Sequence, residues 1–295
     1  TNIPTPRRYS GIVSNNGRIY VMGGINNSFV ATNIVEEYDP TLNTWRTMTT
    51  MPVTLQGFVA ASEGQDVYAL GGTTTTDMTT GTILNTVYKF TPGIGATGLW
   101  STKVASTSFP AKVDMGGCAI DGTIFFNTGR FYSDGSAQTS SDGYVVSANT
   151  TTTLAEANFS LARFGAGSAC YRPLPSDPNP TDPPAILLVG GSTLANTIQS
   201  PSSILPSNRY DVYQTAASNT VNSGPLLPVS LFFPAIEISY QLRRAYIFGG
   251  ASAINVGTNS VYRIDITNPL AGPWTTLTTS MPVTRYGHKA IILSR

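Results

Sequence analysis

The chain has 295 residues, a formal charge of +1, and charged side chains at only 11% of positions, against about 25% in an average soluble protein. Its near-neutral charge gives no reason to expect a nucleic-acid partner, and without an apolar run of about 18 residues we expect no membrane insertion. One histidine and two cysteines are too few for a histidine-based or thiolate metal site, so we expect no cofactor.

The polar residues of the chain are mainly Thr, Ser and Asn, and lysine is scarce. This composition favours an extracellular or cell-surface protein, although a β-rich protein with many polar turns would look the same. Candidate N-glycosylation sequons begin at Asn26, Asn149 and Asn158, but chance predicts about that many in so Asn-rich and Ser/Thr-rich a chain. A secreted glycoprotein is therefore an expectation that the sequons do not strengthen.

A short apolar segment that ends in glycine recurs five times along the chain. The copies are GRIYVMGG (17–24), QDVYALGG (65–72), TIFFNTG (123–129), AILLVGG (185–191) and RAYIFGG (244–250). Each predicts a buried strand followed by a turn that needs positive φ or a close backbone approach. We therefore expect structural roles for Gly23, Gly24, Gly71, Gly72, Gly129, Gly190, Gly191, Gly249 and Gly250, while Thr128 shows that the first glycine is a preference.

Other strand-like segments flank every copy. YSGIVS (9–14), GFVAAS (57–62), GGCAID (116–121), FGAGSAC (164–170) and PAIEIS (234–239) precede the five copies. NIVEEYDP (33–40), NTVYKF (85–90), GYVV (143–146), RYDVY (209–213) and SVYRID (260–265) follow them, and Trp45, Trp100 and Trp274 mark a fourth element in three units. Each unit is then a four-stranded antiparallel meander, and a radial arrangement of the units would bury both faces of each.

These repeats resemble the kelch repeats of a β-propeller. The family signature is Pro-x-x-Arg-x-Gly, an apolar strand, Gly-Gly, Tyr-Asp-Pro, Trp and Met-Pro, and the first unit has Gly23-Gly24, Tyr38-Asp39-Pro40, Trp45 and Met51-Pro52. The resemblance implies an all-β fold, a single kelch β-propeller domain over residues 1–295. The expected blades are 7–52, 53–109, 110–159, 160–228 and 229–281.

The strand that opens a unit occurs a sixth time, as RYGHKAIILS (285–294). We expect five four-stranded blades plus an extra terminal strand within 282–295 that closes the ring, because an open ring leaves unpaired strand edges. The alternative is an incomplete six-bladed ring.

The long polar loops after the glycine strands share one face with the connections between blades, which makes that face the predicted binding face. Arg8, Arg163 and Arg285 are assigned to one repeat position in three units, where other units have Leu55, Val113 and Leu231. Tyr9, Phe164 and Tyr286 follow the arginines, and Arg130, Phe131 and Tyr132 come after Gly129. In kelch domains that capture acidic peptides, arginine at this position lines the pocket, and the resemblance extends that role to the three arginines. Alternatively, each arginine pairs with a carbonyl or carboxylate of a neighbouring blade.

The single histidine, His288, stands in MPVTRYGH (281–288), and the related MPVTLQGF (51–58) has Phe58 at its place. This substitution favours a packing role over catalysis. An enzyme that resembles galactose oxidase needs two histidine ligands for copper, which one histidine cannot supply. We therefore expect a non-catalytic module that binds a protein partner or a glycan, with a structural or assembly role at an extracellular surface or filament as the alternative and an enzyme as the third possibility. The oligomeric state is left open.

Cys118 and Cys170 lie at same-parity positions on the opening strands of adjacent units. A disulfide between them would suit an extracellular location, and two buried thiols are the alternative.

Overall fold

The computed structural model describes residues 1–76, 82–103, 109–130, 136–153, 159, 161–177, 180–193, 205–215, 220–253 and 255–292. These residues form strands, turns and irregular connections, and none of them lies in a helix. In the described ranges there is accordingly no helix that is long and apolar enough to cross a membrane.

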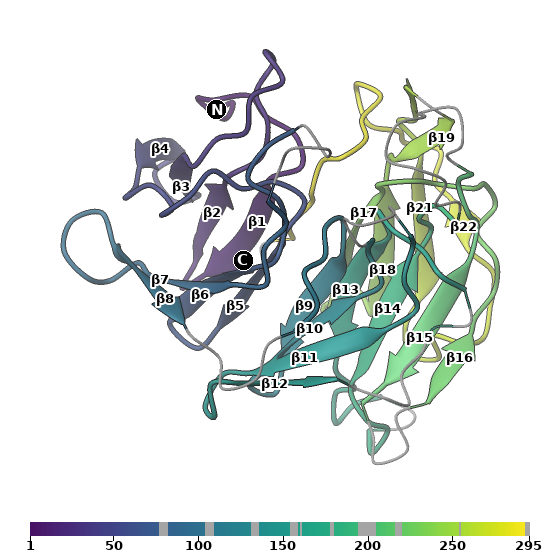
Figure 1. Cartoon of the computed structure of the whole chain (residues 1–295). Helices are drawn as coiled ribbons and strands as arrows, with labels where there is room; N and C mark the ends of the chain where they lie inside the picture. The colour runs from purple at the N-terminus through teal and green to yellow at the C-terminus, as the bar shows by residue number, and fades with distance from the viewer. Residues whose placement is uncertain are drawn as a thin grey trace.

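Five antiparallel sheets of four strands each stand around a common centre (Figure 1). We call them blades 1 to 5 in chain order. Blade 1 is β1 (Gly11–Asn15), β2 (Arg18–Met22), β3 (Val35–Asp39) and β4 (Thr44–Thr47); blade 2 is β5 (Val59–Glu63), β6 (Asp66–Leu70), β7 (Val87–Thr91) and β8 (Leu99–Lys103); blade 3 is β9 (Gly116–Ile120), β10 (Thr123–Asn127), β11 (Ser141–Val145) and β12 (Thr150–Thr153); blade 4 is β13 (Gly167–Tyr171), β14 (Ala185–Val189), β15 (Tyr210–Gln214) and β16 (Val221–Ser223); blade 5 is β17 (Ala235–Ser239), β18 (Arg244–Phe248), β21 (Val261–Asp265) and β22 (Thr275–Thr276). A small hairpin of β19 (Ala251–Ala253) and β20 (Val256–Gly257) stands in the loop after β18. The predicted all-β fold with five four-stranded blades is confirmed.

The hydrophobic core lies between neighbouring blades. Residues that alternate along β2, such as Tyr20 and Met22, pack with Val67 and Ala69 of β6 in one buried cluster. Equivalent clusters join blade 2 to blade 3, blade 3 to blade 4 and blade 4 to blade 5. Where two blades face each other, each sheet buries its neighbour, which is why the second strand of a unit reads as a nearly continuous apolar run.

The glycine turns have the backbone that the repeat predicted. Gly24 has a φ of +94°, and a Cβ there would lie 2.6 Å from the carbonyl oxygen of Arg8. Thr128, which replaces the first glycine in blade 3, has a φ of +58°. A non-glycine residue tolerates this left-handed conformation at some cost, which fits a preference at the first position.

A ring of backbone hydrogen bonds joins the starts of the blades. Its members are Tyr9, Gly57, Asp114, Gly165, Phe233 and Gly287, and each has a φ between +49° and +64°. Each N–H donates to the carbonyl of the preceding member, with N···O distances of 2.8–3.3 Å, and Tyr9 donates to Gly287 to close the ring. The ring therefore has six equivalent positions, of which five begin a four-stranded blade.

The sixth position belongs to the terminal segment, residues 282–292, which runs between β1 and β17 (Figure 1). In every blade the inner strand begins two residues after the ring member, so the equivalent strand here would begin at Lys289. Residues 289–292 have no ladder partner within the described part of the chain. The segment thus closes the ring through the backbone of Gly287 and not by replacing β1.

The inner strands and residues 289–291 enclose a central channel of about 300 Å³. Cys118 of β9 and Cys170 of β13 line it and are joined in a disulfide, with their Cα atoms 5.6 Å apart. Glu237 of β17 also lines the channel, and burial raises its pKa to about 7. A carboxyl group and a disulfide are therefore the chemical features of the channel wall.

Candidate functional site

The ring hydrogen bonds show which residues of the different blades are equivalent, and they change the residues assigned to the repeated arginine position. The second glycine of each pair donates its N–H to a residue two positions before a ring member, namely Leu55, Lys112, Arg163, Leu231 and Arg285. Counting two positions back from Tyr9 gives Arg7, not Arg8. The sequence alignment of Arg8 and Val113 with Arg163 and Arg285 was therefore wrong by one residue, and Arg7 and Lys112 are the true equivalents.

Three cations at this position are buried and ion-paired inside their own blades. Arg7 pairs with Glu36 of β3 at 2.6 Å, and Lys112 pairs with Asp142 of β11 at 2.6 Å. Burial lowers the pKa of Lys112, and the charge of Asp142 opposes that shift. Each ion pair joins the segment before the first strand of a blade to the third strand of the same blade. The paired side chains are buried and are not available to a ligand.

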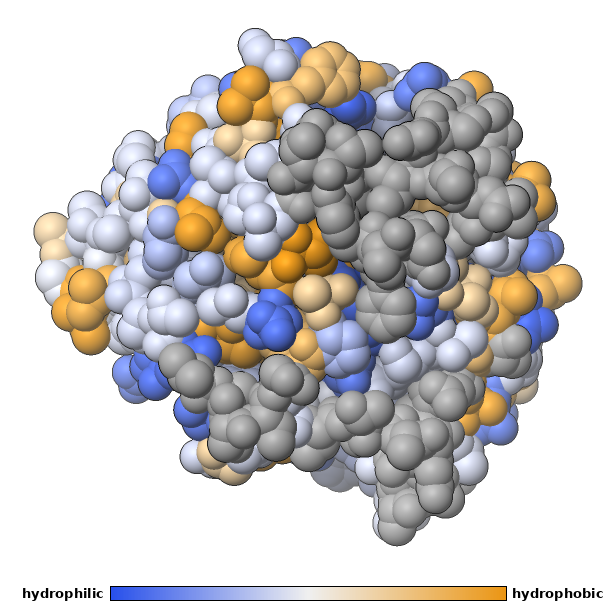
Figure 2. All heavy atoms as spheres, in the orientation of Figure 1, coloured by the Kyte–Doolittle hydropathy of each residue, from blue (hydrophilic) through white to orange (hydrophobic). Residues whose placement is uncertain are grey.

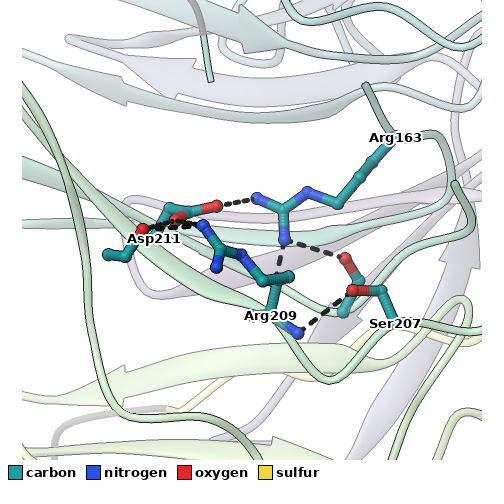
Figure 3. A network of polar contacts seen from close by, with 6 residues as sticks. Arg163, Ser207, Arg209 and Asp211 are labelled. Atoms are coloured by element: carbon teal, nitrogen blue, oxygen red, sulfur yellow. Dashed lines mark hydrogen bonds and ion pairs between the residues drawn. The ribbon is translucent and has the colours of Figure 1, made fainter. Parts of the chain in front are cut away.

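Arg163 is the third member of this group (Figure 3). Its side chain has 0% exposure and donates to Asp211 Oδ2 at 2.5 Å and to the carbonyl oxygen of Gly190 at 3.2 Å. Burial lowers the pKa of Arg163 to about 10, and the charge of Asp211 opposes this effect, so Arg163 stays protonated at neutral pH. The expectation that Arg163 lines a binding pocket is corrected, since its guanidinium lies in the interior.

The two other blades have uncharged residues at the same pair of positions. Leu55 lies with Tyr88 in one buried cluster, and Leu231 lies with Tyr262 in another. Tyr88 and Tyr262 are the second residues of β7 and β21, as Asp211 is of β15. One structural position therefore accepts either an ion pair or an apolar pair.

Arg8, by contrast, lies at the edge of a surface pocket of about 350 Å³ on the face of the post-glycine loops. Its guanidinium carbon is 5.0 Å from the ring centroid of Phe29, 5.3 Å from that of Tyr9 and 5.8 Å from that of Tyr286. Its Nη1 donates to the hydroxyl of Tyr286 at 3.2 Å. Within the described residues Arg8 makes no ion pair with a carboxylate, so its charge is available to a ligand.

The loop after Gly24 adds an apolar tip to this pocket. Phe29 is 63% exposed and Val30 is 56% exposed. Asn26 holds the loop by accepting hydrogen bonds from the backbone N–H groups of Ser28 and Val30, both at 3.0 Å. Phe29 is not among the residues predicted from the sequence, although it is a lone aromatic residue within the polar stretch NNSFVATN. The loop presents an aromatic side chain that no part of the described chain buries.

The other aromatic candidates differ in exposure. Burial raises the pKa of Tyr9, which packs on Phe233 with ring centroids 4.8 Å apart. Tyr286 is half-buried and donates from its hydroxyl to Asn255 at 3.2 Å. Phe164 is buried and contacts Phe232 edge-on. Tyr286 therefore contacts Arg8 beside the pocket, while Phe164 belongs to the core.

Arg130 lies near the ring on the same face, but it is already paired. Its guanidinium bonds to Asp114 at 2.7 Å and lies over Phe164, 4.8 Å from the ring centroid. Phe131 and Tyr132 lie outside the described residues, as does the sequon residue Asn158. Arg130 can join a ligand only by sharing or leaving Asp114.

Arg285 lines the Arg8 pocket, is exposed, and forms no ion pair within the described ranges. His288, three residues on, packs near Gly249, and burial together with the charges of Arg285 and Lys289 lowers its pKa to about 4. No group of three or more His, Cys, Asp or Glu side chains able to hold a metal ion occurs within the described part of the chain.

Of the described sequons, Asn26 belongs to the pocket loop and Asn149 accepts a hydrogen bond from Tyr144 at 2.7 Å. Both Asn side chains are half-buried. Glycosylation at either site stays a prediction.

Comparison with known proteins agrees with the repeat architecture. A family model described as Kelch motif matches residues 6–52, which span blade 1 and the connection before it. Beta-scruin of Limulus polyphemus is 29% identical over 93 residues, 31% of this chain. The matched region covers 10% of that protein, so the likeness concerns a small part of it. Five four-stranded blades around a channel, with a kelch motif over the first blade, support a kelch-repeat β-propeller architecture for this chain.

Proposed function

We propose that this propeller is a non-catalytic binding module whose post-glycine face captures an acidic, partly apolar segment of a protein partner. Kelch propellers typically mediate protein binding or assembly, and the proposal adds a location and a ligand chemistry. The observation that supports it most directly is Arg8, whose guanidinium has no ion pair within the described chain and lies near three aromatic rings at a surface pocket.

The chemistry of the pocket favours a carboxylate beside an apolar side chain. A guanidinium fork bonds two carboxylate oxygens at once, and Arg8 and Arg285 place two positive charges on one pocket. Phe29 offers an exposed apolar surface next to them, and aromatic and arginine side chains dominate binding energy at protein interfaces. A neutral glycan would use the aromatic faces but would bring no carboxylate to the two arginines.

The test uses immobilised peptides in which Asp or Glu alternates with Leu or Phe, with Gln-substituted copies as the neutral reference and neutral oligosaccharides as a second arm. We expect the acidic peptides to bind more tightly than the Gln copies. Arg8→Glu should weaken their binding at least tenfold, because it replaces attraction by repulsion.

The matched control is Arg172→Glu, a charge reversal at an exposed arginine away from the pocket, which should leave binding unchanged. Equal loss in both variants, or preference for oligosaccharides over acidic peptides, would contradict the proposal. An unchanged thermal midpoint in Arg8→Glu shows that any loss of binding does not come from unfolding.

An assembly role is a second candidate, because one face of blade 5 lacks the covering that the other blades have. That face carries the inference that follows, which shares Arg285 with the Arg8 pocket but does not depend on Arg8 or Phe29.

A further inference from the structure

One face of blade 5 is uncovered, although its sequence is built for burial. Tyr246 and Phe248 stand three and one residues before the first glycine of their pair. The side chains at these two positions in blades 1, 2 and 4 are at most 3% exposed, namely Tyr20, Met22, Tyr68, Leu70, Leu187 and Val189. Tyr246 and Phe248 are instead partly exposed, because no sheet follows blade 5 within the described residues.

These two residues belong to an apolar groove of about 450 Å³. Leu242, which is 56% exposed, lines the groove together with Leu277 and Ile292. Figure 2, in the orientation of Figure 1, shows hydrophobic residues at the surface near the middle of the molecule, beside the place where the terminal segment runs. An apolar surface of this kind marks an interaction site in many soluble proteins.

The terminal segment beside this face has unused backbone groups. Its ring member, Gly287, is bonded on both sides, to Tyr9 and to Phe233. Residues 289–292 occupy the place of an inner strand but pair with no second strand among the described residues. Such an edge is a template for the addition of another strand.

Arg285 indicates that a polypeptide covering this face should carry a negative charge. The equivalent Arg7, Lys112 and Arg163 each pair with a carboxylate at the second residue of the third strand in their own blade. Arg285 is the fourth cation at this position, and no third strand stands beside it among the described residues. A carboxylate brought to that place would complete a pair that the molecule forms three times elsewhere.

We infer that the blade 5 face and residues 285–292 form a docking surface for a polypeptide that supplies three antiparallel β-strands. The first strand pairs with residues 289–292, the apolar side of the added sheet covers Tyr246 and Phe248, and an Asp or Glu on the middle strand pairs with Arg285. The added sheet would stand at the sixth position of the ring, with the same contacts that blades 2 to 5 make with the blade before them.

The chain itself provides a probe for this surface. A synthetic peptide copying residues 18–52 carries β2, β3 and β4, with Glu36 at the second residue of the middle strand. Adding the peptide to the intact chain should slow hydrogen exchange of the amides of residues 289–292 at least tenfold, because they become part of a ladder. The Glu36→Gln peptide should bind several-fold more weakly to the wild-type chain, and equally well to the Arg285→Gln chain.

Leu242→Lys should abolish the protection, whereas Leu42→Lys, at a leucine that is 69% exposed in blade 1, should not. Arg8→Glu should also leave it intact, which separates this inference from the proposed function. The inference fails if the hydrogen exchange of residues 289–292 is unchanged at saturating peptide. It also fails if the peptide protects these amides equally well in the wild-type, Arg285→Gln and Leu242→Lys chains. A third contrary result would be a dimer of the chain alone, detected by light scattering, in which the same amides are protected. The docking surface would then be occupied by a second copy of the chain.

Discussion

Arg163 and Asp211 form an ion pair at 2.5 Å in the interior of blade 4, with 0% exposure of either side chain. Blade 2 has Leu55 and Tyr88 at the same two positions, and both are buried. The ion pair and the apolar pair are alternatives at one structural position, because each joins the segment before the first strand of a blade to the third strand.

This equivalence makes a direct prediction for stability. Asp211→Ala leaves the guanidinium of Arg163 buried without its partner and should lower the free energy of unfolding by about 3–5 kcal/mol. The double variant Arg163→Leu with Asp211→Tyr reproduces the pair of blade 2 and should recover at least half of that loss. Urea denaturation followed by tryptophan fluorescence measures both. A double variant no more stable than Asp211→Ala would show that the two positions are not interchangeable.

The Cys118–Cys170 disulfide joins adjacent inner strands across a sequence separation of 52 residues. Cross-linking restricts the unfolded chain, so its removal should cost about 2–4 kcal/mol. The paired variant Cys118→Ser with Cys170→Ser should therefore unfold at lower urea concentration than the oxidised protein. In the presence of reductant the midpoint of the wild-type protein should shift in the same direction, while that of the Ser variant stays fixed. No shift on reduction would contradict a stabilising bridge.

The five-bladed architecture could be predicted from the sequence because the glycine-ended strands repeat with recognisable spacing.

The positions of the repeated arginines were harder to predict. Arg8 and Arg163 are each followed by an aromatic residue, which suggested a common position, yet the ring hydrogen bonds align Arg163 with Arg7. A shift of one residue separates an interior ion pair from a surface pocket. The local signal for the correct alignment is the proline spacing, because Pro4-x-x-Arg7 matches Pro282-x-x-Arg285, and the following aromatic residue was given more weight.

The channel residue Glu237 should make stability depend on pH. Burial raises its pKa from 4.5 to about 7, so the folded state holds this proton more tightly than the unfolded state does. Stability from this group is then fully present below pH 4.5 and is lost as the pH rises toward 7. Glu237→Gln should raise the free energy of unfolding at pH 8 by about 1–2 kcal/mol, an amount reduced from the full shift by solvent in the channel. Urea midpoints at pH 4.5 and 8 measure the effect, and an equal change at both would contradict it.

His288 should act in the opposite direction over part of the same range. Its pKa is lowered from 6.5 to about 4, so the folded state resists its protonation and stability falls as the pH drops from 6.5 toward 4. His288→Phe introduces the residue found at the equivalent Phe58 and should remove this acid loss, on the order of 1–2 kcal/mol. Thermal midpoints at pH 4.5 and 7.5 test this prediction. Both proteins compared should carry Glu237→Gln, so that the titration of Glu237 does not contribute. A variant that keeps the full acid loss would show that another group titrates.

The central feature of the fold is a closed ring of six backbone positions, with the terminal segment as its sixth member. Native-state hydrogen exchange of the ring amides, followed residue by residue, tests it directly. Closure predicts that the amides of Gly287 and Tyr9 exchange as slowly as those of Asp114 and Gly165, because each donates to the preceding member. Exchange of the Gly287 and Tyr9 amides at the rate of an unstructured peptide, with the other four still protected, would show that the ring is open.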